Sequence, residues 1–189
     1  MMDLKYFCHT NSFKSMLIDT EKYRELYKTS EGQLAILCAV IFTVMILFLN
    51  QNISDLEMTD VLKSIFSTLI SGMMGLLGFL VTGLAMMASI ITKNAVRNID
   101  TQGKSKSLAG ILFSFYFEGA VVGFNIITMT FFYMLLSFSE DLSSIVLFFS
   151  TLAISYTFNF AVLYAVSLLG SCINFFFVNI YYDKNSKEF

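Results

Sequence analysis

Residues 108–138 read LAGILFSFYFEGAVVGFNIITMTFFYMLLSF, an apolar run of 31 residues that contains a single charge, Glu118. A hydrocarbon core about 30 Å thick is crossed by roughly 20 apolar residues of helix, so this run is long enough to span a membrane. Glu118 comes ten residues after Leu108, which is about 15 Å along a helix. Because an ionisable group inside a span is costly unless it is paired, protonated or hydrated, Glu118 is a candidate functional residue.

Two depths of Glu118 in the bilayer are open at this point. A span that begins at Leu108 puts the carboxyl group near mid-bilayer, and a span that begins nearer Gly110–Phe115 leaves it closer to the inner headgroups. Asn125 follows seven residues later and shares its helix face. Asn159, in the next apolar run, is expected to reach the inner half and meet Glu118. Glu118, Asn125 and Asn159 are therefore the predicted polar path or intramembrane site, with a buried structural hydrogen bond as the alternative.

The composition is that of an integral membrane protein. Hydrophobic residues make up 56% of the chain and charged residues 14%, whereas charged residues make up about 25% of soluble domains. The runs predict an all-α, four-helix membrane bundle within 33–182, with spans at 33–49, 64–92, 108–138 and 143–174. The last uncharged run covers 142–182, about 60 Å of helix. It must therefore tilt, project, or break near Gly170.

The N-terminal segment 1–32 is polar and mixed in charge. A cap at Asn11 or Ser12 and apolar residues three and four apart from Phe13 to Tyr27 predict an amphipathic helix. Such a helix docks a cytosolic partner, lies on the inner leaflet, or packs on its own bundle. Residues 183–189 are the predicted cytosolic tail.

The distribution of basic residues predicts that both termini are cytosolic. Of the 12 Lys and Arg residues, all except Lys63 lie in residues 1–32, the 93–107 loop or the tail. These are the segments on the inner side if four spans follow a cytosolic N-terminus. The expected location is the bacterial inner membrane, with multiple passes. The predicted partner-facing residues of the inner loop are Lys93, Arg97, Lys104 and Lys106.

Two rows of small residues are predicted helix-packing or oligomer contacts. The first row has four-residue spacing and the second is a Gly-x-x-x-Gly pair. Small side chains let helix backbones approach closely, which drives association in lipid. The residues of the two rows are Ser67, Ser71 and Gly75, then Gly119 and Gly123.

The sequence argues against an enzyme. The predicted spans hold one carboxyl group and no His, Lys or Arg, so the groups for intramembrane proteolysis are missing. The single His9 and the scattered Cys8, Cys38 and Cys172 match no metal or redox motif. We therefore expect no catalytic residues, no metal and no cofactor. A net charge of -2 without a basic block also argues against a direct nucleic-acid partner.

The plan of the chain resembles a family of small membrane proteins. Four spans, inner termini and the stretch GMMGLLGFLVTGLAMMAS at Gly72–Ser89 are similar to four-span proteins of bacterial anti-phage defence systems, nearest the membrane subunit of the Kiwa system. The resemblance implies a homo-oligomer of the inner membrane that senses infection and works with a cytosolic effector protein, or a membrane effector that depolarises the cell. It carries no residue roles over to this chain.

Two function classes follow as expectations. The first is a homo-oligomeric sensor or pore component, and a pore would need several copies because four small helices enclose too little space. The second is a small proton- or cation-coupled transporter in which Glu118 is the exchanging acid. The expected partners are membrane lipid, further copies of the chain and a cytosolic effector protein.

Overall fold

The computed structural model describes residues 17–18, 22–90, 105–138 and 144–185. The described elements are all helical, and four of them are long and apolar enough to cross a membrane. The predicted all-α fold is therefore confirmed, and the chain is a multi-pass membrane protein. The elements are η1 (Lys22–Arg24), α3 (Glu25–Lys28), α4 (Ser30–Asn52), α5 (Asp55–Ile90), α7 (Ser105–Phe138) and α8 (Ser144–Asn185).

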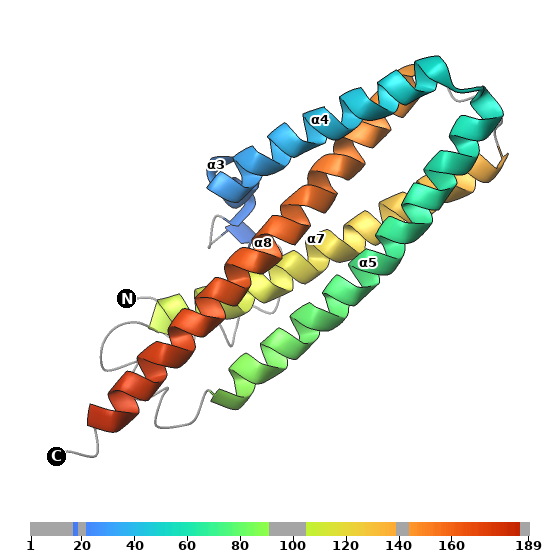
Figure 1. The fold of residues 1–189 in the computed structure, drawn as a ribbon. Coiled ribbons are helices and arrows are strands. Elements are labelled where there is room, and N and C mark those ends of the chain that lie inside the picture. The colour runs from blue at the N-terminus through green and yellow to red at the C-terminus, as the bar shows by residue number, and fades with distance from the viewer. Residues whose placement is uncertain (1–16, 19–21, 91–104, 139–143, 186–189) are drawn as a thin grey trace.

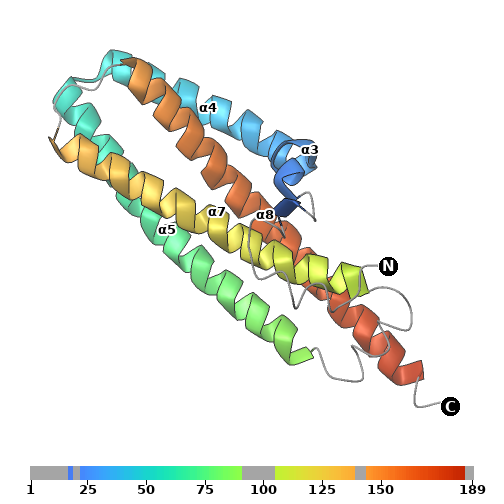
Figure 2. The same ribbon diagram turned by 180° about the vertical axis from the view of Figure 1, so that it is seen from behind.

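The four long helices run up and down in an elongated antiparallel bundle (Figures 1 and 2). Helix α4 packs mainly on α8, α5 packs on α7, and α7 and α8 join the two pairs. The turn from α4 to α5 lies at the same end of the bundle as the end of α7 and the start of α8, which we call the far end. The N-terminal segment, defined as η1 and α3, lies beside α8 at the opposite end of α4 (Figure 1).

The helices are longer than the predicted spans. Helix α5 begins at Asp55 rather than at residue 64 and takes Asp60 and Lys63 into its first turns. Helix α8 runs without interruption from Ser144 to Asn185, so of the three predicted alternatives the break near Gly170 is excluded. With 42 residues in one helix, about 63 Å, α8 must tilt or project beyond the bilayer.

Of the predicted amphipathic N-terminal helix, the structure describes residues 17–18, which are α-helical, and residues 22–28. Residues 22–28 make one 3₁₀ turn and one α-turn, and Thr29 is extended (ψ 159°) before α4 begins. The Thr29 hydroxyl oxygen accepts a hydrogen bond from the backbone N–H of Gly32 at 3.2 Å and so caps α4. Leu17 and Leu26 pack against the bundle core, in agreement with the alternative that this segment packs on its own bundle. Asn11, Ser12 and Phe13 lie outside the described residues.

The interface between α4 and α8 is built on small side chains of α4. The buried residues of this helix are Gly32, Ala35, Ala39 and Thr43. They recur at intervals of three and four and therefore lie on one face. Since lipid tails are as apolar as leucine, the close packing of such residues holds membrane helices together.

We expect Ala39→Leu to destabilise the bundle by about 1–2 kcal/mol, because Ala39 is buried and a longer side chain pushes α4 away from α8. Val40→Leu, on the exposed side of the same helix, is the matched control and should cost less than about 0.5 kcal/mol. Thermal unfolding of both variants in detergent makes the comparison. Equal melting temperatures would show that the small residues do not hold α4 in place.

Candidate functional site

Glu118 lies inside the bundle. Its exposed fraction is 0%, and the carboxyl oxygens have no hydrogen-bond partner among the residues that the structure describes. Residues one before and four after it on α7, Phe117 and Val122, belong to the main hydrophobic cluster. An unpartnered buried polar group costs about 1–3 kcal/mol, and a charged group costs more. The buried carboxyl group of Glu118 therefore lowers the free energy of unfolding of the bundle.

Asn125 and Thr151 are buried in the same way. Asn125 is 0% exposed, and both its amide nitrogen and its amide oxygen lack a partner in the described part of the chain. The seven-residue spacing predicts that Asn125 shares the face of Glu118, and the structure buries both residues. The hydroxyl of Thr151 on α8 is likewise buried and unpartnered within those ranges. Three unsatisfied polar side chains thus lie within one bundle.

The expected meeting of Asn159 with Glu118 is wrong. The amide nitrogen of Asn159 donates to the carbonyl oxygen of Ser155 at 2.8 Å and lies 3.3 Å from the Ser155 hydroxyl. The physical reason is local: an amide four residues further along a helix reaches its own backbone without the help of another helix. Asn159 is therefore not part of the site around Glu118.

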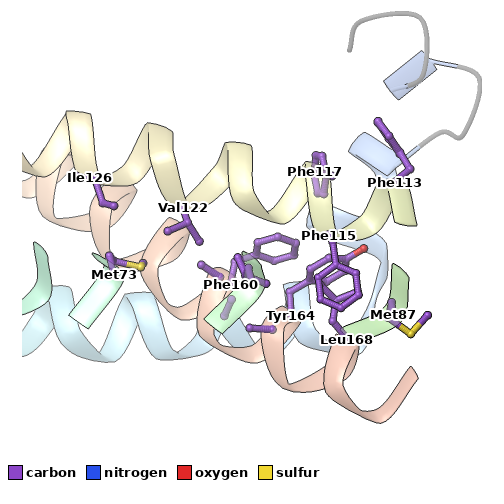
Figure 3. Packing of buried hydrophobic residues seen from close by; sticks show 14 residues of the cluster. Met73, Met87, Phe113, Phe115, Phe117, Val122, Ile126, Phe160, Tyr164 and Leu168 are labelled. Atoms are coloured by element: carbon purple, nitrogen blue, oxygen red, sulfur yellow. The ribbon is translucent and has the colours of Figure 1, made fainter. Parts of the chain in front are cut away.

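Tyr164 of α8 packs beside the turn of α7 that carries Glu118, because its ring contacts Phe117, the residue before Glu118. The Tyr164 ring meets Phe117 edge to face at 6.1 Å between centroids and stacks on Phe160 at 5.3 Å. Figure 3 shows Tyr164 and Phe160 on α8 facing the cluster residues of α7. The row Tyr156, Phe160 and Tyr164, spaced four apart, is the sequence signal that marks this face of α8.

The hydroxyl of Tyr164 connects α8 to the N-terminal segment. It donates a hydrogen bond to Oε2 of Glu25 at 2.5 Å, and Nζ of Lys22 lies 2.6 Å from the other carboxylate oxygen of Glu25. A second tyrosine, Tyr156, donates to the carbonyl oxygen of Leu26 at 2.5 Å. Two tyrosines of α8 therefore hold η1 and α3 in place, a contact that the sequence interpretation did not include.

Counting along the helices favours the shallower of the two depths for Glu118. From Glu118 to Phe138, at the far end of α7, the helix advances 20 residues, about 30 Å. That is one hydrocarbon thickness. Tyr164 bonds to Glu25, which precedes the first residue of α4 by five positions. With the far end at one boundary of the bilayer, this length places Glu118 near the opposite boundary, level with the start of α4.

The first small-residue row faces outward within one chain, and the glycines of the second row are half-buried. A Cβ atom added to Gly75, Gly119 or Gly123 would meet no described atom within 4 Å, and Ser67 and Ser71 are exposed. Helix α5 instead buries residues seven apart, among them Met73 and Leu80; at 100° per residue, Gly75 lies on the opposite side from Met73. Packing of these rows inside the bundle is therefore wrong, and contact between copies stays a prediction.

The remaining predicted features do not change the site. The described residues contain no group of three or more His, Cys, Asp or Glu side chains that could hold a metal ion. Cys38 and Cys172 are free thiols. Of the inner-loop residues, Lys93, Arg97 and Lys104 lie outside the described residues, and Lys106 belongs to the first turn of α7.

We expect Glu118→Met to stabilise the bundle by about 1 kcal/mol, because it removes two unsatisfied oxygens and keeps an unbranched side chain in the same space. Thermal unfolding in detergent measures the change, with Glu57→Met, an exposed acid near the start of α5, as control. A lower melting temperature for Glu118→Met would mean that the carboxyl group has a stabilising partner, such as internal water.

The site lies on three parts of the chain: α7 carries Glu118, α8 carries Tyr164 and α3 carries Glu25. Its components are an acid that has no hydrogen-bond partner among the described residues and a tyrosine that joins the acid's surroundings to a partly exposed ion pair. No protein-family model, curated protein or solved structure matches this chain.

Proposed function

We propose that this chain is a non-enzymatic protein of the bacterial inner membrane that assembles from several copies and acts as the sensor or membrane-perturbing component of an anti-phage defence system, together with a cytosolic effector protein. The observation that carries the proposal is the unpartnered Glu118 inside the bundle, adjacent to a tyrosine that bonds to the N-terminal segment. A sensor needs an element with two states, and a group held at the expense of stability is a candidate for that element.

The N-terminal segment is the proposed output to the partner. Glu25 and Lys22 lie at the end of the bundle that the basic residues predict to be cytosolic. A change in the charge or hydration of Glu118 would act on Tyr164 and, through its hydrogen bond, on Glu25. The rows around Gly75 and Gly119 leave small residues free for contact between copies.

The burial of Glu118 also favours a second candidate function. An acid enclosed within one chain, rather than exposed on the surface where copies would meet, suits a small proton- or cation-coupled transporter. A pore between copies would require α7 to rotate before Glu118 could line it. The transporter is therefore retained as the alternative.

The test of the defence function is protection of cells from infection. The chain is expressed with the product of the adjacent gene, and plating of phage and membrane potential are measured for the wild type, Glu118→Gln and the control Glu57→Gln. We expect Glu118→Gln to lose protection at a normal membrane level and Glu57→Gln to keep it. If neither the wild type nor Glu57→Gln protects the cells, and the chain alone catalyses proton-coupled uptake, the sensor proposal is contradicted and the transporter is the better explanation.

The assembly state is measured separately by native mass spectrometry of the protein in nanodiscs, alone and with the product of the adjacent gene. The proposal expects a discrete oligomer that retains the second protein. A monomer without a partner would contradict it and favour the transporter.

A further inference from the structure

A chain of polar side chains leads from the surface of the bundle to Tyr164. The side chains of Lys22 and Glu25 are 15% and 29% exposed, so the carboxylate of Glu25 is in reach of water. Its Oε2 accepts the hydrogen bond from the hydroxyl of Tyr164, a residue that is itself only 6% exposed. The tyrosine oxygen is therefore one hydrogen bond away from a group that exchanges protons with solvent.

On its other side, Tyr164 faces the polar residues of α7. The hydroxyl of Ser114 donates to the carbonyl oxygen of Gly110 at 2.8 Å and lies beside the Tyr164 hydroxyl. Glu118 comes four residues after Ser114 and so lies on the same face, one turn further into the bundle. The Tyr164 ring meets Phe117, the residue before Glu118, edge to face at 6.1 Å between centroids, so Tyr164 lies beside the turn of α7 that carries Glu118. Tyr164 thus lies between a surface acid and a buried acid.

The other elements packed around this point contribute apolar side chains. Ala35 of α4 and Met73 and Leu80 of α5 belong to the cluster that surrounds the site. Glu31, in the first turn of α4, interacts with Ser167 rather than with Tyr164. Among the described residues, the ionisable groups that approach Glu118 are therefore Tyr164 and, beyond it, Glu25 with Lys22.

We propose that Glu25, Tyr164 and Glu118 form a proton path between water at the N-terminal end of α4 and the interior of the bundle. The inference goes beyond the proposed function, because a sensor and a transporter would both need a route by which Glu118 gains and loses its proton. Tyr164 is the gate of this path. Ser114 and one water molecule, or a rotation of the Glu118 side chain, close the remaining gap to the buried carboxyl group.

Each step moves one proton. Glu25 takes a proton from a hydronium ion, which leaves as water. The Tyr164 hydroxyl, which donates to Glu25 at rest, rotates toward Glu118 and releases its proton to that carboxylate as its oxygen takes the proton of Glu25, so one O–H bond breaks as another forms. The new O–H bond of Tyr164 points at Glu25, which restores the starting hydrogen bond. The reverse sequence carries a proton outward, and no other reactant is needed.

The test is hydrogen–deuterium exchange of the Glu118 carboxyl group, followed by infrared spectroscopy of the full chain in lipid. The carboxyl band that disappears in Glu118→Gln is assigned to Glu118, and its shift after transfer to D₂O gives the exchange rate. We expect Tyr164→Phe to slow this exchange by roughly a hundredfold, as for loss of a positioned proton donor. The matched control is Tyr156→Phe, which loses a hydrogen bond to the same N-terminal segment but lies off the path.

Exchange in Tyr164→Phe that is as fast as in Tyr156→Phe would overturn the path, because protons would then reach Glu118 by another route. Absence of a Glu118 band in the wild type would overturn it as well. Should Tyr164→Phe fail to assemble, Glu25→Gln takes its place. That variant is expected to slow the exchange, whereas Glu31→Gln, at the same end of the bundle, is expected not to. The measurement needs neither infection nor a partner, so its failure is distinguishable from failure of the defence function.

Discussion

Phe160→Ala is expected to lower the free energy of unfolding of the bundle by about 2–3 kcal/mol. Phe160 is 0% exposed and is the largest fully buried side chain in the described part of the chain. In water-soluble proteins the same change costs about 3–5 kcal/mol, as lost transfer energy plus a cavity. In a membrane the transfer contribution is small, since lipid is as apolar as the core, and the lost packing contacts remain.

The effect should reach the candidate site. The Phe160 ring stacks on Tyr164 and contacts Tyr156 at 6.3 Å between centroids, so its loss frees the two tyrosines that hold the N-terminal segment. We therefore expect this variant to show faster proteolysis within residues 22–28 as well as a lower melting temperature.

The control for this prediction is Phe149→Ala on the same helix, where the side chain is 64% exposed and is expected to contact lipid. It should change the free energy of unfolding by less than about 0.5 kcal/mol. A thermal-shift assay with a thiol-reactive dye reports unfolding through the half-buried Cys38 and Cys172. Equal melting of the two variants would mean that Phe160 does not support the core.

The four long helices could be predicted from the sequence, because a helix that crosses the bilayer needs an apolar stretch of a minimum length. Apolar runs of roughly 17 residues or more match the helix length that crosses a bilayer, so the four spans follow from hydrophobicity alone. The shared face of Glu118 and Asn125 was equally predictable, because it depends on the period of a single helix. Both properties are local to one segment.

The contacts between helices could not be predicted in the same way. In a soluble helix the polar side faces water, whereas here the lipid side and the core side are both apolar, so hydrophobicity does not show which face packs. Asn159 was matched with Glu118 by depth alone, but Asn159 bonds to Ser155 on its own helix, and it is Tyr164 of α8 whose ring contacts Phe117 beside Glu118. Gly75 was assigned to packing by residue size, yet it lies opposite Met73 on α5.

A row of small residues on α4 was not among the sequence predictions. Ala35, Ala39 and Thr43 are buried on one face of this helix, and Gly32 at its start lies against the backbone of α3. The contacts of the N-terminal segment are harder to predict from sequence. The chain changes direction at the extended Thr29 between α3 and α4, and no strong sequence signal marks that residue. The hydrogen bond of Glu25 to Tyr164 joins residues 139 positions apart, a distance over which local patterns carry no information.

Gly32→Ala is expected to lower the free energy of unfolding by about 2–3 kcal/mol, more than most single-methyl additions. A Cβ atom at this position would overlap the carbonyl oxygen of Leu26 and lie 2.8 Å from its carbonyl carbon. These are backbone atoms, which cannot move aside as the end of a flexible side chain can. The substitution therefore forces α3 away from the start of α4.

Moving α3 away from the start of α4 removes hydrogen bonds that depend on the close approach of these two helices. The Leu26 carbonyl accepts the hydrogen bond of Tyr156, and the neighbouring Glu25 accepts that of Tyr164. Gly72→Ala is the matched control, because nothing lies within 4 Å of its added Cβ and alanine is favoured over glycine in a helix by about 1 kcal/mol. We expect opposite shifts in melting temperature, downward for Gly32→Ala and unchanged or upward for Gly72→Ala. A Gly32→Ala protein as stable as wild type would show that α3 does not need its place against α4, and the hydrogen bond from the Tyr164 hydroxyl to Glu25 would then have to form without it.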